Sequence, residues 1–503
     1  PRWWRAEDCG VALPVMIANG RRIEQRTELG TEKGLDGFIE HLIGCGFDPI
    51  RFDGRDPAAF VCTLMEMEQR LQRRVQEYRN GVLRYPLPIP YAIAETTKGF
   101  GFYGAGENAA HNLPLPGNPR HHAPSRELFN QHATQLWVAP EALDLARQRL
   151  ANHQTSGRKL ERDHPLATRN PAQPVIPVVD WSHESLSPMQ AVDRFFVALV
   201  QANPDLRARV GNPDELASNR LGGVLEALKH RVCDPESELE AIDGRIITAL
   251  NEEAVVSACL ANKGGLNLVA SYEAFCVKML GAVRQELIFA RHQRLAGRPA
   301  NWLGFPLIAT SHTWENGKNE QSHQDTSFCE ALLGEMHDGM RVLFPADYNS
   351  TLANGGYQLG EMLRASQRLT THGQSWKLVY LQEPGRFSIP RDHLEAGCAA
   401  PPKLTEKLFP AALQRRVMLT HMRPEVLRGH LHNLLPSPSH SRVMGYINQG
   451  GTLDEAGMLF ANRCSWAHVL VAAAQVLEQD PQAWMDEYEW AAVNGLGNPA
   501  ILR

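Results

Sequence analysis

Apolar and polar positions follow two alternating patterns along the chain. Short apolar runs such as residues 11–18 and 91–97 are typical of buried strands, whereas residues 57–78 carry apolar side chains at helical spacing. Asp56 stands directly before that stretch, where its carboxylate can cap a helix. The repeated strand–helix order predicts an α/β fold in which helices cover parallel sheets.

The same patterns predict further elements. We expect helices at residues 35–44, 188–202, 219–230, 253–260, 272–292, 326–337 and 466–477, and strands at residues 49–52, 266–270, 305–310, 340–344 and 376–381. Two proline-rich stretches, residues 165–177 and 401–410, interrupt the alternation and indicate domain boundaries.

The length of 503 residues is too great for one hydrophobic core, so several domains are expected. The pattern predicts a first parallel-sheet domain at residues 1–164 and a linker at 165–187. A second parallel-sheet domain follows at 188–400, and a small, abbreviated C-terminal α/β domain at 401–503.

Composition narrows the function classes. Hydrophobic residues make up 43% of the chain and charged residues 21%, which is ordinary for a globular protein, and the net charge of −5 does not favour nucleic acid. We find no apolar run long enough to span a membrane and no secretory signal at the start. Nine scattered cysteines lack zinc or redox spacing and favour a reducing, cytoplasmic setting.

The most unusual polar segment is residues 311–325. It follows the apolar run at 305–310 and contains two His, two Asn and two Gln, which is poor material for packing. In open α/β sheets, ligands bind outside the carboxyl ends of the strands. The segment is therefore a candidate site.

Several segments resemble, in the same order, the phosphoketolases, which are thiamine-diphosphate enzymes related to transketolase. They are residues 44–57, 98–100, 110–116, 212–221, 244–252, 271–275 and 311–325, with a weaker likeness at 445–452. The resemblance implies two thiamine-diphosphate-binding-type domains. Residues 1–164 would be the remainder of the diphosphate-binding domain, and 188–400 the pyrimidine-binding domain.

The resemblance also implies an activity. Phosphoketolases are carbon–carbon lyases that cleave xylulose 5-phosphate or fructose 6-phosphate with inorganic phosphate, giving acetyl phosphate and an aldose phosphate. The cofactors would be thiamine diphosphate and Mg²⁺. Active sites of the family lie between two subunits, so we expect a homodimer or a larger assembly.

Four residues match the family's catalytic positions. Glu252 matches the glutamate that holds the cofactor's aminopyrimidine in its imino form; the alternative is an acidic residue in a first helical turn, where acids are favoured anyway. His111, Asn319 and His323 match residues around the reacting carbon, and histidine suits proton transfer near neutral pH. The alternative for His323 is a loop histidine bonded to backbone.

For His111 the competing positions are its neighbours His121 and His122, which lack the Pro114–Pro116 context. A core role for His111 is not expected, because it lies in a loop rich in Gly and Pro.

Ser218, Arg220 and Tyr272 resemble ligands of the substrate phosphate, together with Asn319 and His323. Arginine offers a planar fork that matches phosphate oxygens, and a hydroxyl adds a donor. The alternatives are a helix cap for Ser218, a solvated Arg220, and core packing for Tyr272.

Tyr272 and Phe275 also match the lining of the cofactor pocket, and Lys98 matches a lysine near the diphosphate. Asn19 matches a ligand of the bridging Mg²⁺, which prefers hard oxygen donors. Asn-Gly is also a common turn, and Lys98 has the alternative of a surface loop lysine.

The chain departs from the family pattern at several positions. Only eighteen residues precede Asn19, and none forms the Gly-Asp-Gly segment that carries the metal aspartate. We expect a second subunit or a longer natural chain to supply it. Gln382 stands where the family has a phosphate-binding lysine, Asn112 replaces a glutamine, and Val269 replaces a stacking aromatic.

These departures keep two other functions open. One is a thiamine-diphosphate enzyme that acts on an α-keto acid, because Gln382 carries no charge for a phosphate. The other is a non-catalytic or partner-dependent subunit with a phosphoketolase-like fold.

Overall fold

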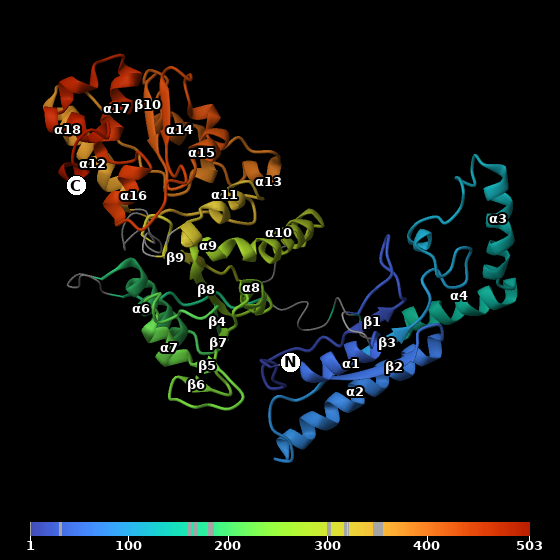
Figure 1. Ribbon diagram of the computed structural model, residues 1–503. Helices are drawn as coiled ribbons and strands as arrows, with labels where there is room; N and C mark the ends of the chain where they lie inside the picture. The colour runs from blue at the N-terminus through green and yellow to red at the C-terminus, as the bar shows by residue number, and fades with distance from the viewer. Residues whose placement is uncertain are drawn as a thin grey trace. The chain divides into compact units, whose positions relative to one another are not determined.

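The computed structural model describes residues 2–29, 33–157, 160, 163, 170–179, 186–298, 303–315, 319, 321–345 and 356–503. Of the predicted linker, residues 165–169 and 180–185 lie outside the described residues. The chain forms two compact units, drawn in Figure 1. Unit 1 comprises residues 1–167 and 232–235, and unit 2 comprises residues 168–231 and 236–503; each is described by itself.

Unit 1 is built on a three-stranded parallel sheet in the order β1-β3-β2. Its elements are β1 (Val15–Ala18), α1 (Leu35–Gly44), β2 (Phe47–Asp53), α2 (Pro57–Arg79), β3 (Ile89–Glu95), η1 (Asn108–His111), α3 (Ala123–Ala133), η2 (Thr134–Leu136) and α4 (Pro140–Thr155). The predicted cap of α2 is confirmed, because the Asp56 carboxylate accepts a hydrogen bond from the Ala58 N–H at 2.8 Å.

The core of unit 1 lies between α2 and the sheet. Met67 and Leu71 are the buried apolar residues of α2, and Ala92 and Ile93 in the central strand β3 are fully buried. Few apolar side chains of unit 1 are buried, and α4 contributes none of them, so the core of this unit is small.

Unit 2 contains a six-stranded parallel sheet in the order β6-β5-β7-β4-β8-β9. The strands are β4 (Ala208–Asn212), β5 (His230–Arg231), β6 (Glu240–Ala241), β7 (Ile246–Thr248), β8 (Leu266–Tyr272) and β9 (Leu307–Thr310). The helices around them are α6 (Pro188–Ala202), α7 (Gly222–Leu228), α8 (Glu252–Leu260), α9 (Glu273–Cys276), η4 (Val277–Met279), α10 (Leu280–Leu295), η6 (Gln321–His323) and α11 (Ser327–Leu333).

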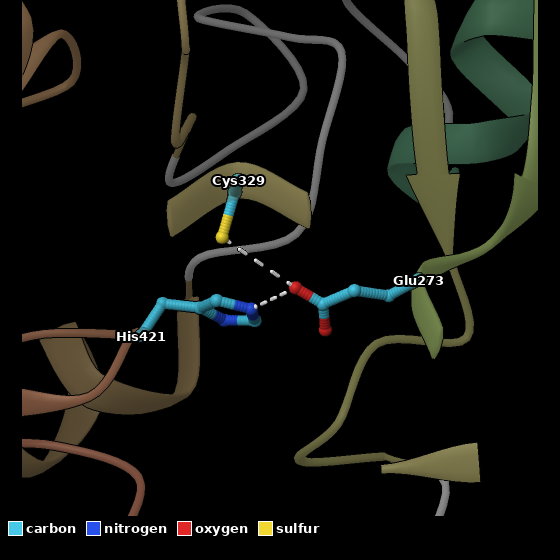
Figure 2. Close-up of side chains that lie close together, drawn as sticks. All are labelled: Glu273, Cys329 and His421. Atoms are coloured by element: carbon cyan, nitrogen blue, oxygen red, sulfur yellow. Dashed lines mark hydrogen bonds and ion pairs between the residues drawn. The ribbon is translucent and has the colours of Figure 1, made fainter. Parts of the chain in front are cut away.

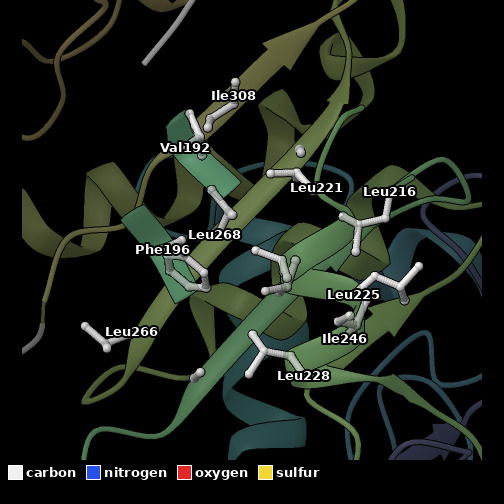
Figure 3. Close-up of a cluster of buried hydrophobic side chains, with 14 of the residues drawn as sticks. Val192, Phe196, Leu216, Leu221, Leu225, Leu228, Ile246, Leu266, Leu268 and Ile308 are labelled. Carbon is white, nitrogen blue, oxygen red and sulfur yellow. The ribbon is translucent and has the colours of Figure 1, made fainter. Parts of the chain in front are cut away.

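Helices cover both faces of this sheet. On one face, Phe196 of α6 and Leu228 of α7 pack with Ile246 and Leu268 of the strands, as Figure 3 shows. On the other face α8 approaches so closely that a Cβ on Gly211 would lie 2.8 Å from the Val255 carbonyl oxygen. β8 is buried on both faces, and its apolar side chains come from Leu266, Leu268, Val269 and Ala270.

The C-terminal part of unit 2 has its own two-stranded parallel sheet of β10 (Arg416–Leu419) and β11 (Ser441–Met444). Its helices are α12 (Gly356–Thr371), η7 (Pro384–Phe387), α13 (His393–Ala396), α14 (Pro402–Leu408), α15 (Pro424–His430), η8 (His432–Leu434), α16 (Glu455–Ala461), α17 (Trp466–Leu477), η9 (Pro481–Trp484), α18 (Glu487–Val493) and η10 (Pro499–Leu502). Ala365 of α12 packs in one core with Leu470 of α17, so this core takes residues from before position 401. The expected domain boundaries remain predictions.

The α/β fold class, with parallel sheets in both units, is confirmed. Two expected strands, residues 340–344 and 376–381, are wrong. The Phe344 N–H donates to the carbonyl of Gln382, directly after the second run, at 2.8 Å, and the Tyr380 hydroxyl donates to the Phe344 carbonyl. Neither run belongs to a sheet, so no strand ladder forms. The expected helix at 272–292 is broken into α9, η4 and α10, and α7 begins only after Arg220, whose φ of 61° is left-handed.

Candidate functional site

The predicted site residues of unit 2 follow the carboxyl ends of neighbouring strands. Ser218 and Arg220 follow β4, Glu252 follows β7, Tyr272 ends β8, and His323 follows β9. Parallel strands place their carboxyl ends at one edge of the sheet, where α/β proteins bind ligands. The topology therefore gathers these residues at one edge of unit 2.

Glu252 is the first residue of α8, and its position is set by Asn251, whose side chain accepts a hydrogen bond from the Ala254 N–H at 2.9 Å. Glu252 is only 8% exposed. Its Oε1 accepts a hydrogen bond from Lys278 Nζ at 3.3 Å. The alternative of a solvated acid in a first turn does not describe this side chain.

An aromatic group lies next to this ion pair. Lys278 Nζ lies 5.0 Å from the ring centre of Phe275, and that ring lies 5.0 Å from the ring of His323. Tyr272 stacks on Phe275 at 6.2 Å with an interplanar angle of 20°. A continuous series of contacts therefore connects Glu252 with His323 within unit 2.

His323 is half-buried in η6, and its Nδ1 lies 2.9 Å from the Ser322 hydroxyl. Ser322 in turn donates to the carbonyl of Asn319 at 2.9 Å, and Asn319 is exposed. These contacts orient the imidazole through a side chain, and the ring has no backbone partner among the described residues. Four other residues of the loop, 316–318 and 320, lie outside the described residues.

The expected phosphate ligands are in part brought together. The Ser218 hydroxyl lies 3.4 Å from the Tyr272 hydroxyl and also donates to the Glu215 carbonyl at 3.0 Å. Arg220 is exposed and follows the buried Asn219, which accepts a hydrogen bond from Thr310 at the end of β9. Ser218 and Tyr272 thus share one surface, while Arg220 is solvated.

The predicted residues of unit 1 have local partners. Asn19 Oδ1 accepts a hydrogen bond from the Arg21 N–H at 3.0 Å, which is the geometry of an Asn-Gly turn. Lys98 is buried, and its ammonium donates to the carbonyls of Arg22 and Asn108. His111 is exposed at the end of η1.

Of the positions that competed with His111, His122 has a structural role. It caps α3, and its Nδ1 accepts a hydrogen bond from the Ser125 N–H at 3.3 Å and lies 2.8 Å from the Ser125 hydroxyl. His121 is exposed. His111 belongs to unit 1 and Glu252 to unit 2.

The departing positions are placed as follows. Val269 is fully buried in β8, and Asn112 is exposed after η1. Gln382 follows the extended segment 376–381, and its backbone carbonyl accepts a hydrogen bond from the Phe344 N–H.

Among the described residues no helix is long and apolar enough to cross a membrane. All nine cysteines are free thiols.

Part of the chain is similar to known proteins. Residues 190–358 match the family model described as D-xylulose 5-phosphate/D-fructose 6-phosphate phosphoketolase. The chain is 25% identical over 378 residues to "Probable phosphoketolase 2" of Lactiplantibacillus plantarum and 27% identical over 389 residues to a "Probable phosphoketolase" of Streptomyces coelicolor. This chain is a relative of the phosphoketolases.

The alignments cover 68% and 70% of this phosphoketolase relative, but 47% of each matched protein. The chain thus spans about half the length of the curated relatives it matches. The fold is that of transketolases. The Pichia stipitis enzyme in complex with sedoheptulose 7-phosphate aligns with a TM-score of 0.59 at 14% identity, covering 92% of this chain and 72% of the other. Transketolase from Leishmania mexicana gives 0.56 at 14%, covering 97% and 73%.

Sequence reasoning missed one group of residues in this phosphoketolase relative. Glu273, the first residue of α9, is 3% exposed, and its Oε1 lies 2.6 Å from Nε2 of His421. Burial acts to raise the pKa of Glu273, but the charge and hydrogen bond of His421 leave that pKa below its usual range. His312 packs against His421 with 5.3 Å between ring centres, and burial lowers the pKa of His312 to about 3, so its ring is neutral.

The missed residues had only weak signals. Glu273 and His312 fall inside the resembling segments 271–275 and 311–325, which marked them as site neighbours without a role. Lys278 and His421 could not be found by pattern, because their partners are 26 and 148 residues away in the chain.

Proposed function

We propose that this chain is a phosphoketolase-like, thiamine-diphosphate-dependent carbon–carbon lyase. It would cleave xylulose 5-phosphate or fructose 6-phosphate with inorganic phosphate, giving acetyl phosphate and an aldose phosphate. The observation that carries the proposal is the buried Glu252 at the carboxyl edge of the sheet. It lies inside the segment that matches the phosphoketolase family model and is linked by contacts to Phe275 and His323.

The site fits one half of the cofactor. A buried carboxyl group beside an aromatic ring suits the aminopyrimidine, which needs a hydrogen bond at a ring nitrogen and an apolar neighbour; Glu252 and Phe275 would provide them. When bound, thiamine diphosphate supplies a carbon nucleophile for the ketose carbonyl. Glu252 would hold the pyrimidine proton in the required place.

The other half fits poorly. The Asn19 side chain already accepts a backbone hydrogen bond, and the Lys98 ammonium is bound to two carbonyls. Among the described residues, the group of His, Cys, Asp or Glu that could hold a cation is in unit 2, not beside Asn19. We therefore derive no step through Mg²⁺. Its binding, by Asn19 together with an additional segment or subunit, stays a prediction, as do the homodimer and the cytoplasmic setting.

Substrate would be held and protonated by the remaining residues. Ser218 and Tyr272 present two hydroxyls 3.4 Å apart, which can share a phosphate oxygen, and the solvated Arg220 can bind the same group. His323, oriented by Ser322, can donate a proton to the substrate oxygen that gains charge. Asn319 and His111 would complete the surroundings of the reacting carbon.

The direct test combines binding and product formation. Purified protein is titrated calorimetrically with thiamine diphosphate and MgCl₂, alone and with any protein that co-purifies from the source cells. Acetyl phosphate is then measured with each ketose phosphate. Saturable cofactor binding with acetyl phosphate in either arm supports the proposal. No heat and no product in both arms refute it, and activity on pyruvate instead would identify the α-keto acid enzyme.

The local partners of Asn19 and Lys98 favour a second candidate, a subunit that needs a partner chain or is not catalytic. A cell strain that depends on the protein separates the two. If the chain is catalytic, alone or with its partner, the Glu252→Ala variant no longer supports growth of this strain. An unchanged phenotype identifies a structural subunit.

A further inference from the structure

Three segments that are distant in the sequence place metal-ligating side chains together within unit 2. Glu273 begins α9, Cys329 lies on α11, and His421 follows β10. Figure 2 shows the three side chains pointing toward one another. One ligand atom from each residue lies within 4.8 Å of the other two. Glu273 Oε1 is 2.6 Å from His421 Nε2 and 3.9 Å from Cys329 Sγ.

We propose that Glu273, Cys329 and His421 bind one zinc-class divalent cation per chain. A carboxylate, a thiolate and an imidazole form a mixed oxygen, sulfur and nitrogen set, which suits Zn²⁺ and the similar Co²⁺. This site is separate from the expected Mg²⁺ position beside Asn19 in unit 1. It does not depend on the proposed function.

The distances fit a site in which a proton now takes the place of the cation. Zinc bonds of about 2.0–2.3 Å at tetrahedral angles separate ligand atoms by roughly 3.3–3.8 Å. The oxygen–sulfur distance of 3.9 Å is close to this value. The oxygen–nitrogen distance of 2.6 Å is that of a hydrogen bond, so a cation would replace the shared proton and part the two atoms by about 1 Å.

The surroundings hold the ligands as a metal site requires. Glu273 Oε2 accepts a hydrogen bond from the Thr313 N–H at 2.8 Å, which fixes the carboxylate. Glu273 and His421 are 3% and 9% exposed.

The neighbouring histidine is not a fourth ligand. His312 Nδ1 accepts a hydrogen bond from the Trp314 N–H at 3.2 Å, so its proton is on Nε2 and no lone pair is free for a cation. The fourth position is left for water. His421 also lines a cavity of about 700 Å³ between α12, α17 and β10.

A cation here would have a structural effect. Glu273 belongs to the helix that carries Phe275, whereas His421 lies in the loop that follows strand β10 of the C-terminal sheet of unit 2. Binding both would fix the C-terminal part against the element that lines the candidate site. We therefore expect the cation to stabilise unit 2, because a ligand that binds the folded state alone raises its stability.

The test uses the full chain carrying Cys45→Ala. Cys45 Sγ is exposed 3.6 Å from His41 Nε2 and could bind cations at the surface. Cells are grown with added ZnCl₂, and the purified protein is analysed by mass spectrometry for metals. Protein refolded from chelator with CoCl₂ is then examined for thiolate-to-cobalt absorption. We expect about one zinc per chain, a cobalt–thiolate band and a higher melting temperature with Zn²⁺.

Matched variants assign the ligands. Cys329→Ala and His421→Phe should each lower zinc affinity by more than about 100-fold, because even outer partners of a metal site contribute 10–100-fold. Cys464→Ala removes another buried thiol and should bind like the parent. Circular dichroism verifies folding. Less than a tenth of a zinc per chain with no cobalt–thiolate band, or full binding by folded Cys329→Ala, overturns the proposal.

Discussion

Units 1 and 2 both carry predicted site residues at the carboxyl edge of a parallel sheet, but the hydrogen-bond partners of these side chains differ between the two units. Asn19 follows β1 and Lys98 follows the adjacent β3. Their polar atoms are bound by backbone groups of unit 1. In unit 2, Glu252 and His323 have side-chain partners and lie beside aromatic rings. Position at the edge of a sheet is thus not sufficient for a site, because the polar groups must also remain available.

The largest effect is expected at Glu252. Glu252→Ala should lower the rate of acetyl phosphate formation by about 10²–10⁴-fold, the range lost when a positioned acid–base group is removed. The matched control is Glu253→Ala, an exposed acid in the same helical turn, which should leave the rate unchanged. The measurement is the steady-state rate with each ketose phosphate. Equal losses in both variants would assign the effect to the helix terminus.

A substitution of Lys98 tests whether this predicted site residue of unit 1 has a structural role. Lys98→Met should lower the free energy of unfolding of unit 1 by about 1–3 kcal/mol, because it leaves the carbonyls of Arg22 and Asn108 without their buried donor. Lys33→Met, which removes an exposed ion pair with Glu40, should change it little. Urea unfolding followed by circular dichroism provides the measurement. A loss of cofactor affinity at unchanged stability would show that Lys98 is a ligand after all.

The fold could be predicted where periodicity is long. Residues 35–44, 188–202 and 466–477 form helices as expected, since two to four turns of amphipathic spacing leave little ambiguity. The strands β4 and β7 escaped prediction because Arg209, Gly211 and Asn212 interrupt the apolar run of β4, and because β7 has only three residues. The extended segments at 340–344 and 376–381 look like strands in sequence, but strand formation needs a partner that only the tertiary structure supplies.

The residues of the candidate site also divide into those that the sequence could predict and those that it could not. The residues that follow strand ends could be named from sequence because a strand and its following loop are adjacent in the chain. Their partners could not. Lys278 reaches Glu252 only because α8 and η4 pack together, and His421 reaches Glu273 from the loop that follows β10. Contacts between distant segments have no local pattern.

The stability of unit 1 against acid should depend on Asp48. Partial burial acts to raise the pKa of Asp48, but hydrogen bonds and charges of Arg74 and Arg70 outweigh it and hold that pKa below its usual range. A lowered carboxyl pKa stabilises the fold above the ordinary value of about 3.9, and this contribution is lost as pH falls through the lower folded value. Unit 1 should therefore lose stability below about pH 4.

Asp48→Asn should remove that part of the pH dependence and cost about 1 kcal/mol at neutral pH. The control is Asp144→Asn, whose ion pair with Arg147 is on the exposed surface of α4. Unfolding curves at several pH values between 3 and 7 are compared for the three proteins. A wild-type slope retained in Asp48→Asn would place the acid sensitivity elsewhere.

The smallest effect is expected at Lys278. This prediction tests whether the Glu252 carboxylate in unit 2 is available to a ligand. The ammonium holds one oxygen of Glu252 at 3.3 Å, so the pyrimidine must compete with it. Because the Lys278 side chain is 58% exposed, the ion pair is weak, and Lys278→Met should raise affinity for thiamine diphosphate by only about two- to fivefold. Lys263→Met, which breaks the ion pair with Glu286, should not change it. A lower affinity in Lys278→Met, measured by calorimetry, would mean that the lysine contributes to binding and that Glu252 needs it as a partner.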